Sequence, residues 1–136
     1  MANSEQTSYS QAPRRILIVD DSSLVRLYYR ETLEKAGFAI EQAINGIEAM
    51  EKVLARPFDL VIVDINMPRM DGLSFLRALR RATPEVARLP ALMITTEAGE
   101  QDVGEARAAG TNFYLVKPVS ETDLLRHVAI LTGAPP

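Results

Sequence analysis

Reactive side chains follow three apolar runs of the sequence. Asp20 and Asp21 follow the run ILIV, Asp64 follows LVIV, and Lys117 follows FYLV. An apolar run without alternation is typical of a strand that is buried on both faces, as in a parallel sheet covered by helices. A buried strand has no structural need for a carboxylate at its end. The acids at these positions therefore suggest a function.

The order of strands and helices predicts where these side chains meet. Apolar runs predict five strands, at residues 16–20, 38–43, 60–64, 92–95 and 113–116. Helical spacing predicts five helices, near residues 23–36, 47–54, 73–79, 99–109 and 120–131. Ser23 is expected to cap the start of the first helix. This alternation is typical of a doubly wound α/β fold with a parallel sheet. Functional groups of such folds gather at the carboxyl ends of strands, so one edge should carry Asp20, Asp21, Asp64, Thr95 and Lys117.

Composition limits the classes of function. The 136 residues suit one domain, which we expect at residues 14–132, between a disordered tail at 1–13 and a short tail at 133–136. The sequence has no cysteine, which excludes thiolate metal sites, and its one histidine, His127, is expected at the surface. A net charge of −3 without a basic block argues against nucleic acid. No segment resembles a signal peptide or a membrane span, so we expect a cytoplasmic protein.

Clustered carboxylates need a cation or protons. Two charges about 5 Å apart repel by roughly 3 kcal/mol at an effective dielectric constant near 20. With only oxygen ligands available, Mg²⁺ is the natural cation, and it commonly shares its coordination with a substrate phosphate. Lys117 adds a positive charge suited to phosphate, and Thr95 adds a hydroxyl donor. The set describes a phosphoryl site in which one aspartate could act as the nucleophile.

The order of these motifs resembles the receiver domain of two-component response regulators. The resemblance covers residues 14–132 and is nearest to the stand-alone, CheY-like chemotaxis type. It rests on Asp20-Asp21, the segment DINMPRMDG from Asp64, the segment TTEA from Thr95, and Tyr114 with Lys117-Pro118. The resemblance implies a flavodoxin-like strand order of 2-1-3-4-5 and a protein that is a switch rather than an enzyme with a metabolite substrate.

The resemblance also implies roles for the acidic residues. Asp64 would accept a phosphoryl group from a histidine kinase or a histidine phosphotransfer protein. Asp21 and Asp64 would bind Mg²⁺ through their side chains, Asn66 through its backbone carbonyl, and Asp20 mainly through water. We expect a monomer that signals to a downstream protein target.

Three further residues would contact the phosphoryl group or respond to it. Lys117 would pair with one phosphoryl oxygen, and Thr95 would donate a hydrogen bond to another. Tyr114 would then turn from an outward to a buried position. A cis peptide between Lys117 and Pro118 is also expected, because the chain must turn away while the lysine points back into the crevice.

Simpler explanations exist for several of these residues. Asp20 and Asp21 could merely favour the start of a helix. Thr95 could be an ordinary strand residue, and only the receiver pattern separates it from its neighbour Thr96. Tyr114 could belong to the core. Asp71, before a glycine at the start of a helix, is interpreted as an N-cap rather than a metal ligand.

Other classes of protein also use such a site. Haloacid-dehalogenase-type phosphatases have a strand-end aspartate nucleophile and Mg²⁺, but they place a second acid two residues later, where this sequence has Asn66. A flavodoxin-like nucleotide-binding module would need a glycine- or hydroxyl-rich loop after the first strand. Here that loop is Asp20-Asp21-Ser22-Ser23, whose charge would repel phosphate without a metal.

Two surfaces are candidates for partner binding. On a helical wheel Leu27 points outward, flanked by Arg26 and Arg30, and we expect the phosphodonor to dock there. The opposite side of that helix should face the sheet, with Val25, Tyr29, Leu33 and Ala36. Residues 97–109 carry four acids and one arginine, which disfavours an acidic partner peptide. A phosphorelay shuttle or a phosphate sink is therefore the alternative output.

Overall fold

One parallel sheet organises the chain. The computed structural model describes residues 12–96 and 99–134. Its five strands lie in the order β2-β1-β3-β4-β5, and all neighbours are parallel. Their bounds are β1 (Arg15–Val19), β2 (Ala39–Ala43), β3 (Leu60–Val63), β4 (Ala91–Thr95) and β5 (Phe113–Val116). The predicted doubly wound α/β fold and its strand order are therefore confirmed.

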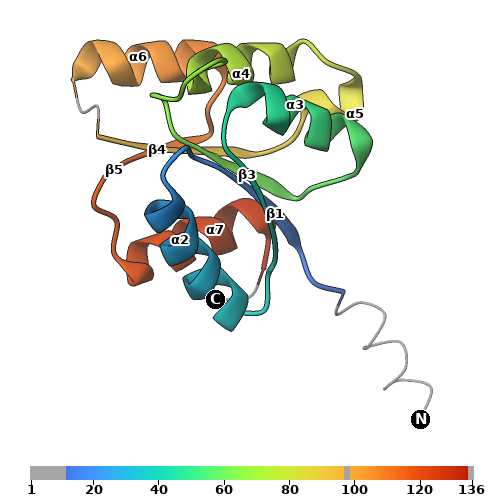
Figure 1. The fold of residues 1–136 in the computed structure, drawn as a ribbon, viewed down its shortest axis with the longest axis vertical. Coiled ribbons are helices and arrows are strands. Elements are labelled where there is room, and N and C mark those ends of the chain that lie inside the picture. The colour runs from blue at the N-terminus through green and yellow to red at the C-terminus, as the bar shows by residue number, and fades with distance from the viewer. Residues whose placement is uncertain (1–11, 97–98, 135–136) are drawn as a thin grey trace.

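Helices cover both faces of the sheet. Figure 1 shows α2 and α7 on one face, and α3, α4, α5 and α6 on the other. Their bounds are α2 (Ser23–Lys35), α3 (Gly46–Ala55), α4 (Gly72–Arg80), α5 (Pro84–Ala87), α6 (Glu100–Ala109) and α7 (Glu121–Thr132). Of the predicted tails, residues 1–11, Pro135 and Pro136 lie outside the described residues.

Strand side chains alternate between two hydrophobic cores. On β1, Leu17 and Val19 belong to the core under α3, α4 and α6, whereas Ile16 and Ile18 belong to the core under α2 and α7. The same alternation continues along β3 and β4, so the central strands are buried on both faces. Their continuous apolar sequence follows from this double burial.

The structure corrects two sequence expectations about the helices. Five helices were expected, but the described part of the chain has a sixth, the single turn α5, with Pro84 in its first turn. Ser23 was expected to cap α2, but Ser22 is the N-cap and its hydroxyl accepts from the backbone N–H of Val25 at 3.3 Å. Asp71 caps α4 as expected, because its carboxylate accepts from the backbone N–H of Ser74 at 2.8 Å.

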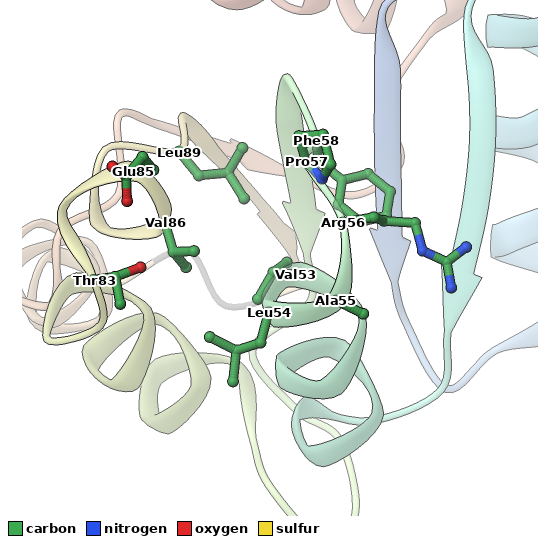
Figure 2. A pocket seen from close by; sticks show the side chains of 10 residues that line it. All are labelled: Val53, Leu54, Ala55, Arg56, Pro57, Phe58, Thr83, Glu85, Val86 and Leu89. Carbon is green, nitrogen blue, oxygen red and sulfur yellow. The ribbon is translucent and has the colours of Figure 1, made fainter.

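The short helix α5 creates a groove away from the strand ends that carry the acids. The groove has a volume of about 380 Å³ and lies between the end of α3 and α5. In Figure 2, Val53, Leu54, Val86 and Leu89 point toward one another, and the guanidinium of Arg56 points away. Phe58 and Leu89 precede β3 and β4, so this groove lies at the amino ends of the strands. No helix among the described residues is long and apolar enough to cross a membrane.

Candidate functional site

Three carboxylates meet where β1 and β3 end. One side-chain oxygen from each of Asp20, Asp21 and Asp64 lies within 4.8 Å of the others. Asp20 and Asp64 are buried, whereas Asp21 is exposed to solvent. The cluster forms because β1 and β3 are adjacent and in register, with Val19 opposite Val63, so that the next residue of each strand emerges at the same edge.

Lys117 completes this cluster from the end of β5. Its ammonium nitrogen lies 2.9 Å from Oδ2 of Asp20 and 3.7 Å from Oδ1 of Asp64. The backbone N–H of Lys117 donates to the carbonyl of Thr95 at 2.8 Å, which fixes the chain beside β4. The peptide between Lys117 and Pro118 is cis, as predicted. The side chain of Lys117 reaches back across the sheet edge to the two carboxylates, while the chain continues toward α7.

The turn between β1 and α2 holds Asp20 from several directions. Its Oδ1 accepts from the backbone N–H of Ser22 at 2.9 Å, and its carbonyl accepts from Nη1 of Arg26 at 2.7 Å. Nε of Arg26 also donates to Gln42 on β2, at 2.9 Å. Sequence reasoning missed these positioning contacts. The only signal for Ser22 was its polar side chain directly before a helix.

A close backbone approach fixes the loop that follows Asp64. The N–H of Gly72 donates to the carbonyl of Ile65 at 2.8 Å. A Cβ atom on Gly72 would lie 2.1 Å from the carbonyl oxygen of Asp64, so only glycine fits at this position. Gly72 begins α4 and is therefore a positioning residue for the segment that carries Asp64. A glycine directly after an N-cap aspartate is the sequence signal that could have identified it.

The electrostatics of the cluster make the charged form of Asp64 unfavourable. Burial raises the pKa of Asp64 to about 6 from an ordinary value of 3.8. The ammonium of Lys117 opposes this shift, and the carboxylates of Asp20 and Asp21 add to it. Burial, followed by the charges of Asp20 and Asp64, also raises the pKa of Tyr29, which lies beneath the site on α2. Protonation of one carboxylate, or a bound cation, would relieve this excess of negative charge.

The other predicted site residues lie around this edge. Thr95 ends β4 and is fully buried, whereas Asn66 is exposed two residues beyond Asp64. Tyr114 on β5 is half-buried and packs against the core under α3, α4 and α6. Thr96, the alternative to Thr95, is exposed in the segment beyond the strand.

Two of the three side chains expected to form a docking surface on α2 are exposed. Leu27 is 49% exposed and Arg30 is exposed, but the guanidinium of Arg26 is turned back to Asp20 and Gln42. Leu24, which was not considered from the sequence, is 77% exposed and lies one turn before Leu27. Of the four residues expected to face the sheet, Tyr29 and Leu33 are buried and Val25 is partly buried, whereas Ala36 is exposed, against expectation.

The acidic segment and His127 are only partly as the sequence suggests. Within the acidic segment 97–109, Glu97 and Ala98 lie outside the described residues, and residues 100–109 form α6 with Gly99 as its N-cap. His127 was expected at the surface but is half-buried, because its ring packs edge-on against Phe113 with ring centroids 5.3 Å apart.

The donor set fits a hard divalent cation. Three carboxylates offer oxygen atoms within 4.8 Å of one another, and Mg²⁺ binds through one or two carboxylates with water in its remaining positions. The adjacent ammonium of Lys117 adds a positive charge on the same side of the cluster. An anion with several oxygens, such as a phosphoryl group, would be held between the cation and the lysine.

Comparison with known proteins agrees with this geometry. The family model described as response regulator receiver domain matches residues 16–129. The chain belongs to this family. Members of this family are signalling proteins rather than classical enzymes, and they accept phosphoryl groups and bind Mg²⁺ in an acidic cleft. The expected domain bounds of 14–132 stay a prediction.

Curated relatives of this receiver domain differ in length. It is 40% identical over 111 residues to the chemotaxis protein CheY-3 of Vibrio cholerae, a match that covers 81% of this chain and 85% of that protein. It is 38% identical over 112 residues to the gliding motility regulatory protein of Myxococcus xanthus, covering 79% of this chain but only 14% of that protein.

Solved structures show the same fold. The chemotaxis protein CheY4 of Vibrio cholerae has a TM-score of 0.83 at 37% identity, covering 88% of this chain and 99% of that chain. The receiver domain of a sensor histidine kinase from Pseudomonas aeruginosa has a TM-score of 0.83 at 28% identity, covering 90% and 99%. That structure has a magnesium ion coordinated in its active-site cleft.

Proposed function

We propose that this receiver domain accepts a phosphoryl group on Asp64, with Mg²⁺, and changes its surface in response. The observation that supports the proposal is the position of Asp64, buried in a cluster of three carboxylates with Lys117 at 3.7 Å. Mg²⁺ would be held by the side chains of Asp21 and Asp64, by the carbonyl of Asn66, and through water by Asp20.

The proposed reaction transfers the phosphoryl group from a phosphohistidine. A carboxylate oxygen of Asp64 forms a bond to phosphorus while the bond from phosphorus to the donor's imidazole nitrogen breaks. The nitrogen keeps the electron pair and takes up a proton from water, and Asp64 becomes an acyl phosphate. Mg²⁺ held by these carboxylates would offset the negative charge on the transferred oxygens. Lys117 pairs with one of these oxygens and holds the group beside β5.

The proposed response begins at Thr95. Its hydroxyl, at the end of β4, would donate to a phosphoryl oxygen and draw its loop toward the site. Tyr114 on the neighbouring strand β5 would then move from its half-buried position into the core. The surface formed by α6, β5 and α7 would change for a downstream protein target.

Small phosphodonors test this proposal without any partner protein. Acetyl phosphate with Mg²⁺ should add one phosphoryl group to the wild-type protein, measured by intact mass, and EDTA should prevent the addition. Asp64→Asn should remove it, whereas Asp71→Asn, a matched change of a nearby N-cap carboxylate, should retain it. Phosphorylation of Asp64→Asn at the wild-type rate would refute the assignment.

We propose that the phosphodonor is a histidine kinase or a histidine phosphotransfer protein that docks on α2. The exposed side chains of Leu24 and Leu27 are one turn apart beside the carboxylate cluster. Leu27 is already half-buried, so covering its exposed half would contribute roughly 1 kcal/mol to the complex. Arg30, which forms an exposed ion pair with Glu34 at 3.2 Å, lies one turn further along α2 and would help set the orientation.

The charge of α6 bears on the downstream target. Its sequence contains Glu100, Asp102 and Glu105 against a single basic residue, Arg107. Like-charge repulsion disfavours an acidic peptide on this helix, so we propose a target other than an acidic motor-switch peptide. A phosphorelay shuttle or a phosphate sink is the alternative output that this charge favours.

A further inference from the structure

A tyrosine on α2 contacts the loop that carries Lys117. The hydroxyl of Tyr28 donates to the carbonyl of Val119 at 2.9 Å, across 91 positions of sequence. Val119 is buried and lies two residues after Lys117. Figure 1 shows α2 beside α7 on the same face of the sheet, and the segment from Lys117 to Val119 leads into α7.

The loop between β5 and α7 is thus held at both ends. At Lys117, its backbone N–H donates to the carbonyl of Thr95 at 2.8 Å. At Val119, its carbonyl accepts from Tyr28. Between these two points the Lys117 side chain extends to Asp20 and Asp64. The direction of this side chain depends on the backbone of the loop, so a contact that fixes the loop also fixes the ammonium group.

The position of Tyr28 is itself well defined. Its ring packs against Tyr29 with centroids 5.7 Å apart, and the Tyr29 side chain is buried beneath the site. Tyr28 remains 38% exposed, so this hydrogen bond is not explained as the partner that a fully buried phenol hydroxyl would require. A phenylalanine would keep the ring packing and leave the carbonyl of Val119 without this donor.

We propose that Tyr28 is a positioning residue for Lys117, and that its hydroxyl sets the rate at which Asp64 is phosphorylated. The inference rests on the proposed function of Asp64 and Lys117. Tyr28 touches neither the phosphoryl group nor the metal, so it acts only through the loop. Loss of the Tyr28 hydroxyl should slow phosphoryl transfer and weaken binding of a phosphoryl mimic, while the carboxylates keep their affinity for Mg²⁺.

A matched control is present on the same helix. Thr32 is buried on α2, and its hydroxyl donates to Oε1 of Glu121 on α7 at 3.3 Å. Thr32→Val removes a second hydrogen bond between α2 and the α7 region, but one that lies beyond the loop. It measures the effect of loosening these two helices without releasing the segment that carries Lys117.

The experiment compares Tyr28→Phe, Thr32→Val and wild type. Phosphorylation by acetyl phosphate is followed at saturating Mg²⁺, beryllofluoride affinity by fluorine NMR, and the Mg²⁺ dissociation constant by calorimetry. We expect Tyr28→Phe to slow phosphorylation about fivefold, the effect of losing one hydrogen bond, and to weaken beryllofluoride binding similarly. Its Mg²⁺ dissociation constant should stay at the wild-type value, and Thr32→Val should match wild type in all three measurements.

The outcomes separate this inference from the function on which it rests. If wild type is not modified by either reagent, the proposed function fails. If wild type is modified and Tyr28→Phe reacts at the same rate, only the role of Tyr28 is refuted. Equal slowing by Thr32→Val, or a weakened affinity of Tyr28→Phe for Mg²⁺, would also refute it, because either result indicates a general loosening of the helix or of the site.

Discussion

Replacing Asp64 by asparagine should stabilise the metal-free protein at neutral pH. Burial raises the pKa of Asp64 to about 6, whereas the unfolded chain has the ordinary value of 3.8. The folded state therefore binds the proton more tightly, and stability falls as the pH rises from about 4 to about 6. Above pH 6 the full penalty of the buried charge is present. Asp64→Asn removes that penalty and keeps the shape of the side chain.

The size of the effect follows from the shift. The difference between 6 and 3.8 is about two pH units, and each unit corresponds to roughly 1.4 kcal/mol, which gives about 3 kcal/mol at pH 7.5. The side chain of Asp64 is only 9% exposed, so solvent screens this penalty little. At pH 4.5 most folded molecules carry the proton, and only about 1 kcal/mol of the difference remains.

Urea denaturation measures this difference directly. Unfolding is followed by circular dichroism, since the protein has no tryptophan, at pH 7.5 and 4.5 in EDTA. Asp71→Asn serves as the control. The carboxylate of Asp71 lies outside the cluster, and asparagine is also a good N-cap. Saturating Mg²⁺ should narrow the gap at pH 7.5, because a ligand at a hundred times its dissociation constant adds about 2.7 kcal/mol to the wild type. A gain that is absent at pH 7.5, or equal at both pH values, would refute the reasoning.

Three other predictions test the loop, the docking surface and the output surface. Gly72→Ala should lower the free energy of unfolding by at least about 2 kcal/mol, because its Cβ would clash with the carbonyl of Asp64. Gly104→Ala, at an exposed position of α6 where a Cβ would meet no atom within 4 Å, should stabilise the protein slightly, and equal urea midpoints of the two variants would contradict this. Leu27→Glu should slow phosphotransfer from a histidine phosphotransfer protein but not from acetyl phosphate. Leu54→Glu, on α3 and somewhat more exposed than Leu27, should slow neither, and unchanged transfer in Leu27→Glu would exclude the docking role. The beryllofluoride-activated protein should bind a labelled acidic motor-switch peptide weakly, because the acidic side chains of α6 repel it. Tight binding in a fluorescence titration would show that the charge of α6 does not select the target.

The meeting of the acids with Lys117 was predictable because parallel strands set it. Apolar runs identified β1, β3 and β5, and the carboxyl ends of parallel strands lie at one edge. Asp20, Asp64 and Lys117, each directly after its strand, had to emerge there. The receiver resemblance then assigned roles that the spacing alone leaves open, as it did in separating Thr95 from Thr96.

Contacts that depend on side-chain conformation were not predictable in this way. A helical wheel places Arg26 beside Leu27, but a long arginine side chain can turn back, and here it reaches the carbonyl of Asp20. The single turn α5 is too short to show helical periodicity, although Pro84 after Thr83 is a typical start. His127 lies off the apolar stripe of α7, yet Phe113 from the neighbouring strand covers part of its ring.

Chemical mapping of the phosphorylated residue tests the central claim most directly. The protein is treated with acetyl phosphate and Mg²⁺, and borohydride then reduces the acyl phosphate to the alcohol, which marks the residue for peptide mass spectrometry. The account predicts homoserine at position 64, dependent on Mg²⁺ and absent from Asp64→Asn. Reduction at Asp20, Asp21 or another carboxylate of the wild type, or no reduction at position 64, would contradict it.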